Sequence, residues 1–178
     1  RDAGLLEHPV LKSGHTGIAF GSSTGSTDAI RDFGSMLINH DARGINATSY
    51  IRMMSHTAAV NVALYFGLRG RTLPTSSACT SGSMAIGQAY EAIKYGKQTV
   101  MLAGGAEELC ASEAAVFDTM FATSTRNDTP HLSPRPYDKD RDGLVIGEGA
   151  GCIILEELEH ARARGAHIHA ELVGYGTN

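Results

Sequence analysis

The spacing of apolar residues along the chain alternates between the patterns typical of strands and of helices. Short apolar runs at 15–20 and 99–103 are bounded by polar residues or glycines and predict buried strands. Segment 70–75 reads as extended, 167–173 alternates like a strand, and 144–158 is an apolar, strand-like run with interleaved glycines. Apolar residues at helical spacing predict the helices between them, over 28–38, 55–65, 84–93, 113–120 and 156–164.

This order of elements indicates the fold class. Strands separated by helices predict an α/β fold with a largely parallel sheet. Polar and proline-rich segments at 39–46 and 124–143 predict loops between the regular elements.

A run of small residues around Cys79 joins the extended segment 70–75 to the helix that follows. The thiol would lie in the first turn of a buried helix, where unpaired N–H groups and the helix dipole favour the reactive thiolate form. The small neighbours leave room for a bulky substrate. Because free cysteines are commonly buried and inert, this stretch alone leaves both interpretations open.

Composition narrows the possible functions. The 178 residues are enough for one domain with a core, and the formal charge of −4 gives no basic footprint for nucleic acid. Three cysteines without a CxxC pair argue against a disulfide or zinc scaffold and fit reduced thiols in the cytoplasm. No apolar run of membrane-spanning length and no signal-peptide pattern is present, so neither insertion nor export is expected.

One motif competes with Cys79 for the role of nucleophile. The sequence Gly21-Ser22-Ser23-Thr24-Gly25 matches the G-x-S-x-G elbow of serine hydrolases, between a predicted strand and a predicted helix. Ser23 would then be the nucleophile. Only one predicted strand precedes the motif, whereas such hydrolases place several there.

Other patterns resemble ligand sites without completing them. Asp138, Asp140 and Asp142 imitate the start of a calcium loop, but its twelfth position is a glycine. The glycines at 147, 149 and 151 do not match the dinucleotide fingerprint. His167 and His169 would share one strand face without a third ligand. We therefore expect no metal and no cofactor.

The chain resembles the β-ketoacyl-[acyl carrier protein] synthases of bacterial fatty acid synthesis, type I first and type II next. The motifs that carry the resemblance occur in the family's order and spacing from Thr16 onward: Ser76-Ser-Ala-Cys79, Ala103-Gly-Gly-Ala-Glu-Glu-Leu109, Ser124-Thr-Arg-Asn-Asp128, Ser133-Pro-Arg-Pro-Tyr-Asp138, Arg141-Asp-Gly143, Gly147-Glu-Gly-Ala-Gly151 and Leu155-Glu-Glu-Leu-Glu-His160-Ala161. The resemblance implies a thiolase-like, layered α/β/α/β/α fold of two similar halves that dimerises. Residues 1–178 would form the N-terminal half-domain, without its first strand and without the second half.

The resemblance also implies a reaction and its residues. Cys79 would accept an acyl group from acyl carrier protein as a thioester, and its backbone N–H would form part of an oxyanion hole. A carbanion from decarboxylated malonyl carrier protein would then attack this thioester. Met54 and Phe117 fall where the family lines its acyl pocket. Arg43 falls where a basic residue meets the carrier protein, and a neighbouring family arginine is His40 here.

The chain departs from the family in its remaining catalytic groups. The family uses two histidines and a lysine in its second half, and none of His131, His160, His167 and His169 stands in such a motif. Lys12 and His15 imitate the motif but precede Cys79, and we interpret them as a coincidence. We expect the chain alone not to condense. A non-catalytic homologue is a third hypothesis, against which the presence of Cys79 argues.

Overall fold

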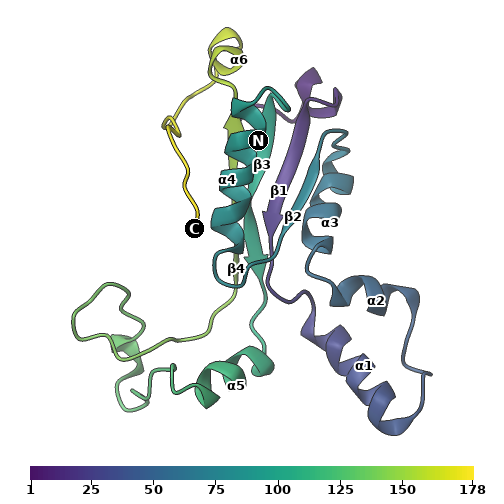
Figure 1. Cartoon of the computed structure of the whole chain (residues 1–178), viewed down its shortest axis with the longest axis vertical. Coiled ribbons are helices and arrows are strands. Elements are labelled where there is room, and N and C mark those ends of the chain that lie inside the picture. The colour runs from purple at the N-terminus through teal and green to yellow at the C-terminus, as the bar shows by residue number, and fades with distance from the viewer. The chain divides into compact units, whose positions relative to one another are not determined.

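The computed structural model describes residues 1–178 as two compact units (Figure 1). The first unit contains residues 1–107 and 150–178, and the second contains residues 108–149. Each unit is described separately below.

The first unit is built on a four-stranded sheet with the order β2-β1-β3-β4. The strands are β1 Thr16–Gly21, β2 Thr72–Thr75, β3 Val100–Glu107 and β4 Gly149–Glu156. β1 is parallel to both β2 and β3. β4 is antiparallel to β3, because Glu157 donates to Thr99 at one end of the pair while Gly151 lies against Gly104 at the other. The predicted α/β class is confirmed, and the sheet is mixed because of its β4 edge.

Helices α3 and α4 cover opposite faces of this sheet (Figure 1). The helical elements of the first unit are η1 Pro9–Lys12, α1 Thr27–Asn39, α2 Ala47–Met53, α3 Thr57–Phe66, α4 Ser81–Lys94 and α6 Leu158–Ala163. On the α3 side, Ile18, Phe20 and Leu102 of the sheet pack against Ala59 and Ala63. Val62 and Phe66 of α3, both partly buried, pack against the same cluster.

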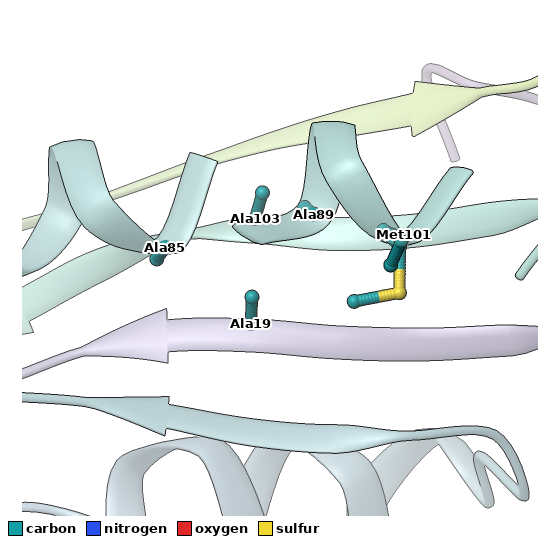
Figure 2. Packing of buried hydrophobic residues seen from close by; sticks show 6 residues of the cluster. Ala19, Ala85, Ala89, Met101 and Ala103 are labelled. Carbon is teal, nitrogen blue, oxygen red and sulfur yellow. The ribbon is translucent and has the colours of Figure 1, made fainter. Parts of the chain in front are cut away.

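Alanine dominates the other face, between α4 and the sheet. Ala85, Ala89 and Ala92 of α4 meet Ala19 and Ala103 of the strands, with Met101 as the one large buried side chain among them (Figure 2). Methyl groups allow the helix backbone to approach the sheet closely. The element that follows Cys79 is thus seated tightly on β1 and β3.

The second unit contains α5 Ala111–Thr119, η2 Pro130–Leu132 and extended loops. Asp142 organises the loops, accepting hydrogen bonds from the hydroxyls of Ser124 and Ser133 and lying near the guanidinium groups of Arg126 and Arg135. The hydrogen bonds from Ser124 and Ser133 hold the pKa of Asp142 below its ordinary value. Desolvation acts in the opposite direction, and the charge of Arg135 lowers the pKa further. The Asp142 carboxylate of the incomplete calcium motif thus links loop segments through hydrogen bonds and ion pairs.

Several element predictions need correction. Helix α2 falls in a stretch that we did not predict as helical, and its capping box at Asn46 and Ser49 accounts for its start. β3 continues beyond position 103 because Gly104 and Gly105 extend the strand rather than end it. The predicted strand over 167–173 has no strand pairing, so its alternation was misleading.

Candidate active site

Cys79 lies in the turn that joins β2 to α4. β2 ends at Thr75, and α4 begins at Ser81 with Thr80 as its N-cap. Cys79 therefore lies immediately before the N-cap. The sequence predicts it inside the first helical turn, but α4 begins two residues after it. Cys79 is exposed, so the expectation that it is a buried cysteine is wrong for this structure, and its role as nucleophile stays a prediction.

The hydroxyl of Ser81 bridges the two sides of this turn. Its Oγ accepts a hydrogen bond from the Ser77 N–H at 2.8 Å and donates one to the Ala78 carbonyl at 2.7 Å. The Thr75 hydroxyl donates to the Ser81 carbonyl at 2.8 Å. Ser81 is 4% exposed and Thr75 is 5% exposed. Hydrogen bonds from these two buried residues therefore join the end of β2, the turn and the start of α4.

Ala78, the residue before Cys79, has a left-handed backbone conformation with φ of 47°. For a residue with a Cβ this conformation costs about 1–2 kcal/mol. Such a conformation persists only where the surroundings fix it, and it is common at functional sites. Here the Thr80 N–H donates to Ser77 and the Ser81 N–H donates to Ala78, each at 3.1 Å, in addition to the Ser81 hydroxyl.

Glycines allow the first turn of α4 to rest directly on the strand ends. Thr75, Gly21 and Gly105 lie in register across β2, β1 and β3. A Cβ added at Gly21 would lie 2.5 Å from the Ser81 carbonyl carbon, and one at Gly105 would lie 3.4 Å from Gly82 Cα. Backbone therefore packs on backbone beside Cys79, and no larger residue fits at Gly21 without moving the helix.

The loop after β1 is held by Glu107, at the end of β3. The Glu107 carboxylate accepts hydrogen bonds from the Ser22 hydroxyl at 3.1 Å, the Ser23 N–H at 2.6 Å and the Thr24 hydroxyl at 3.3 Å. The Ser22 N–H donates to the Thr75 carbonyl at 3.2 Å, which connects the loop to the base of the Cys79 turn. No pattern in the sequence predicted a role for Glu107 or Ser81. An acidic residue at a strand end and a hydroxyl at a helix start were the available signals.

The serine hydrolase alternative gains no support from this geometry. A nucleophile elbow places its serine in a sharp turn between strand and helix. Here Ser23 lies in a loop that ends only at Thr27, where α1 begins, and its N–H is taken by Glu107.

Met54 lies beside the same loop. It is the C-cap of α2, and a Cβ built at Gly25 would lie 2.9 Å from its carbonyl carbon. The Ser26 N–H also donates to the Arg52 carbonyl at 2.8 Å. The end of α2 thus braces the loop after β1. Phe117 lies on α5 in the second unit, and its role in a pocket wall stays a prediction.

Arg43 is on the surface, in the loop between α1 and α2. Its side chain is 92% exposed, and its guanidinium forms an ion pair with Asp41 at 2.6 Å. Hydrogen bonds from Arg43 lower the pKa of Asp41, so this carboxylate is ionised and offsets part of the arginine charge. His40 next to it caps the end of α1 in a left-handed conformation.

The other two cysteines have different surroundings. Cys110 is buried at the start of α5, where its Sγ accepts a hydrogen bond from the Glu113 N–H at 3.3 Å. Cys152 on β4 is exposed, and desolvation, partly offset by a backbone hydrogen bond at Ala103, raises the pKa of its thiol. A raised pKa disfavours the thiolate. Cys152 is therefore a suitable comparison for Cys79.

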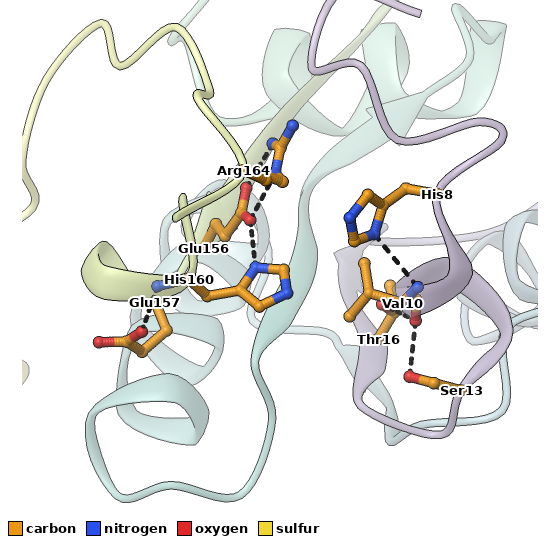
Figure 3. Close-up of polar contacts among 8 residues, drawn as sticks. All are labelled: His8, Val10, Ser13, Thr16, Glu156, Glu157, His160 and Arg164. Atoms are coloured by element: carbon orange, nitrogen blue, oxygen red, sulfur yellow. Dashed lines mark hydrogen bonds and ion pairs between the residues drawn. The ribbon is translucent and has the colours of Figure 1, made fainter. Parts of the chain in front are cut away.

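The opposite end of the sheet carries a charged cluster. Glu156 ends β4 and accepts hydrogen bonds from Arg164 at 2.6 and 2.7 Å and from the His160 Nδ1 at 2.5 Å (Figure 3). Burial raises the pKa of Glu156, but the hydrogen bonds and charges of Arg164 and His160 outweigh it and hold the pKa below its ordinary value. The His8 ring packs edge-on against His160.

Lys12 and His15 also lie at this end. Lys12 ends η1, and His15 directly precedes β1, whereas Cys79 follows the carboxyl end of β2. No group of three or more His, Cys, Asp or Glu side chains is arranged to hold a metal ion. None of the helices is long and apolar enough to span a membrane.

Comparisons with known proteins agree with this fold. The model of the family described as beta-ketoacyl synthase, N-terminal domain, matches residues 1–161. The chain belongs to the β-ketoacyl synthase family. It has the thiolase-like fold of ketosynthases, of which it matches the N-terminal part.

Individual relatives give the extent of the match. The chain is 43% identical to 3-oxoacyl-[acyl-carrier-protein] synthase 2 of Vibrio harveyi and to synthase 1 of Escherichia coli K12, over 98% of its own length. It spans only 42% and 44% of those proteins. The chain also matches the crystal structure of a beta-ketoacyl synthase from Burkholderia phymatum, with 60% sequence identity and a TM-score of 0.90. This match covers 94% of the chain and 41% of the Burkholderia protein. One chain of AntDE:AntF, an acyl-carrier protein in complex with its ketosynthase, matches with 30% sequence identity and a TM-score of 0.75. This match covers 89% of the present chain and 41% of the matched chain.

Proposed function

We propose that the chain forms the acyl-accepting part of a 3-oxoacyl-[acyl carrier protein] synthase of fatty acid synthesis, with Cys79 as the nucleophile. The observation that carries the proposal is the exposed Cys79 thiol, in the turn directly before helix α4, which the hydrogen bonds of the buried Ser81 hydroxyl hold. The names of the 43% identical relatives support it. Residues 1–178 would then form the N-terminal half-domain of the enzyme.

In the proposed reaction, the Cys79 thiolate attacks the carbonyl carbon of an acyl thioester on acyl carrier protein. The tetrahedral oxyanion accepts a hydrogen bond from the Cys79 backbone N–H. The new bond between Cys79 Sγ and the acyl carbon forms as the carrier's sulfur–carbon bond breaks. The carrier sulfur leaves as a thiolate and takes up one proton, which balances the proton that the Cys79 thiol lost. Malonyl carrier protein then loses carbon dioxide, and the resulting carbanion attacks the carbonyl carbon of the Cys79 thioester. The bond between this carbon and Cys79 Sγ breaks, which releases Cys79 as a thiolate and gives the 3-oxoacyl product on the carrier.

The proposed partners are acyl carrier protein and a second copy of the enzyme. A 30% identical relative has been solved as a ketosynthase in complex with its acyl-carrier protein, which supports a carrier partner here. We assign Arg43 to the carrier contact, since its guanidinium remains exposed beside Asp41. Met54 and Phe117 are our candidates for the acyl pocket. Three free thiols suit a reducing compartment, and we propose the cytoplasm.

Covalent loading of the chain tests this proposal directly. Incubation with octanoyl-acyl carrier protein should add one acyl mass to the native protein, measured by intact-mass spectrometry. Cys79→Ala should abolish the addition, while Cys152→Ala and Ser23→Ala should retain it. Loss only in Ser23→Ala would favour a serine hydrolase, and no addition to any form would favour a non-catalytic homologue. Either result would overturn the proposal.

The same material tests whether this chain completes the reaction. We expect no 3-oxoacyl product when malonyl carrier protein is added, because no histidine or lysine of the family's decarboxylation motifs is present in the 178 residues. Formation of this product by the chain would refute that expectation. The acylated cysteine should instead accumulate.

A further inference from the structure

We propose that Ser81 is a positioning residue for Cys79, acting through the backbone of the turn that contains the thiol. This inference rests on the proposed function, since it concerns the acylation of Cys79. Ser81 does not itself contact the reacting atoms. Its role would be to hold the turn in the one conformation that presents both the thiol and the Cys79 N–H to the substrate.

The hydrogen bonds of the Ser81 hydroxyl carry the proposal. One hydroxyl both accepts from the Ser77 N–H and donates to the Ala78 carbonyl, so it uses its donor and an acceptor site on the two residues that precede Cys79. Ser81 itself is 4% exposed, whereas Ser77 and Ala78 are exposed, so both bonds run from a buried hydroxyl to the backbone of surface residues. Removal of the hydroxyl would leave both backbone groups without these partners.

The conformation that these bonds hold is an unfavourable one. Ala78 has a positive φ of 47°, which a residue with a side chain adopts only when its surroundings require it. The carbonyl of Ala78 belongs to the peptide group that also contains the Cys79 N–H. A hydrogen bond to this carbonyl therefore fixes the direction in which the Cys79 N–H points.

Ser81 is itself anchored to the sheet. The Thr75 hydroxyl donates to the Ser81 carbonyl, and Thr75 in turn accepts from the Ser22 N–H through its own carbonyl. Gly21 lets the backbone of β1 lie directly against Ser81. Contacts with β1 and β2 therefore hold Ser81 in place, and a residue that positions another group must itself be held.

A pair of variants with the same shape separates the hydroxyl from its volume. Ser81→Thr keeps the hydroxyl and Ser81→Val replaces it with a methyl group. We expect Ser81→Val to lower the rate constant of Cys79 acylation at saturating octanoyl-acyl carrier protein by about 10- to 100-fold, since a shift near 1 Å can cost that much. The half-saturating carrier concentration should stay unchanged, and Ser81→Thr should restore most of the rate.

Alkylation of Cys79 by iodoacetamide serves as the second readout. This displacement forms no oxyanion, so it needs the thiol but not a directed Cys79 N–H. We expect its rate to be similar in the wild type, Ser81→Thr and Ser81→Val. Thr16→Val is the matched control, because Thr16 is also fully buried and its hydroxyl donates to Val10 at the other end of β1. Its acylation rate should equal that of the wild type.

The outcomes distinguish this inference from the proposed function. Equal acylation by Ser81→Val and wild type would overturn the role of Ser81, as would equal losses in the Thr and Val variants or a parallel loss of alkylation. If the branched variants do not fold, Ser81→Ala adds no atoms and must show the same selective loss. Absence of wild-type acylation at Cys79 would instead overturn the proposed function itself.

Discussion

The two ends of the sheet are built from different chemistry. At the carboxyl ends of β1, β2 and β3, glycine backbone and buried hydroxyl groups hold the Cys79 turn, and the turn itself contains no charged side chain. At the opposite end, the Glu156 carboxylate binds Arg164 and His160 and ties α6 to β4. Short, directional contacts thus hold the candidate site, and ion pairs hold the far end.

This difference indicates what each end must accomplish. In the proposed reaction a substrate must reach the Cys79 thiol, and the groups that hold the Cys79 turn occupy little volume. The far end has no such requirement and is closed by long side chains, with Glu156 and Arg164 only 8% and 14% exposed at their side chains. Changes at the far end should therefore alter stability, and changes around Cys79 should alter geometry and activity as well.

The largest loss of stability is expected at the far end. Arg164→Ala leaves the buried Glu156 carboxylate with His160 alone, and removing one partner of a buried pair costs about 3 kcal/mol in free energy of unfolding. Urea denaturation measures this loss. The control is Arg162→Ala on the same helix, whose exposed pair with Glu159 should contribute under about 1 kcal/mol. Equal effects of the two variants would remove the distinction between the ends.

A smaller loss is expected for Gly21→Ala, beside the candidate site. The added Cβ would meet the Ser81 backbone, which cannot move aside as a flexible side chain would. We therefore expect a loss of about 2 kcal/mol in the free energy of unfolding and slower acylation of Cys79. Gly34→Ala in α1 is the matched control, because nothing lies within 4 Å of its added Cβ. That variant should gain about 0.5–1 kcal/mol. A tolerated Gly21→Ala would show that the close backbone contact does not matter.

The charged end should also make stability depend on acidity. The pKa of Glu156 is lowered in the folded chain, so its contribution to stability is present above the ordinary glutamate range, near 4.3, and is lost as the pH falls through the folded value. Glu156→Gln should therefore show a smaller decline in unfolding free energy between neutral and acidic pH than the wild type. Identical pH profiles for the two proteins would contradict the assignment.

The smallest effect is expected at Ala78. Glycine removes the cost of a positive φ but adds flexibility to the unfolded chain, so Ala78→Gly should change the unfolding free energy by only about 0.5 kcal/mol. Thermal or urea denaturation would detect a larger change. A loss above 2 kcal/mol would mean that the alanine methyl group itself supports the turn.

The local pattern was sufficient to predict the setting of Cys79. Small residues after an extended segment, followed by apolar residues at helical spacing, correspond to β2, the turn and α4. Local signals were insufficient where pairing between distant segments decides the structure. β4 runs antiparallel to β3, and Gly104 is required there because Gly151 approaches it from another part of the chain.

The groups that hold the candidate site could not be predicted from the sequence pattern either. In the sequence, Ser81 is one of several small residues after Cys79, and nothing local indicates that its hydroxyl bridges Ser77 and Ala78. Glu107 binds a loop more than 80 residues earlier, a pairing that only the fold creates. In the other direction, the alternation at 167–173 predicted a strand that has no pairing in the structure.

The alanine layer under α4 limits how this protein can vary. Its methyl groups set the distance between helix and strands. A bulkier residue at Ala85 or Ala89 would therefore move α4, and the Cys79 turn that precedes it, away from the sheet. A smaller one would leave a void. Natural or engineered changes in substrate preference should therefore arise in the loops around the thiol, while the inner surface of α4 acts as a spacer of constant thickness.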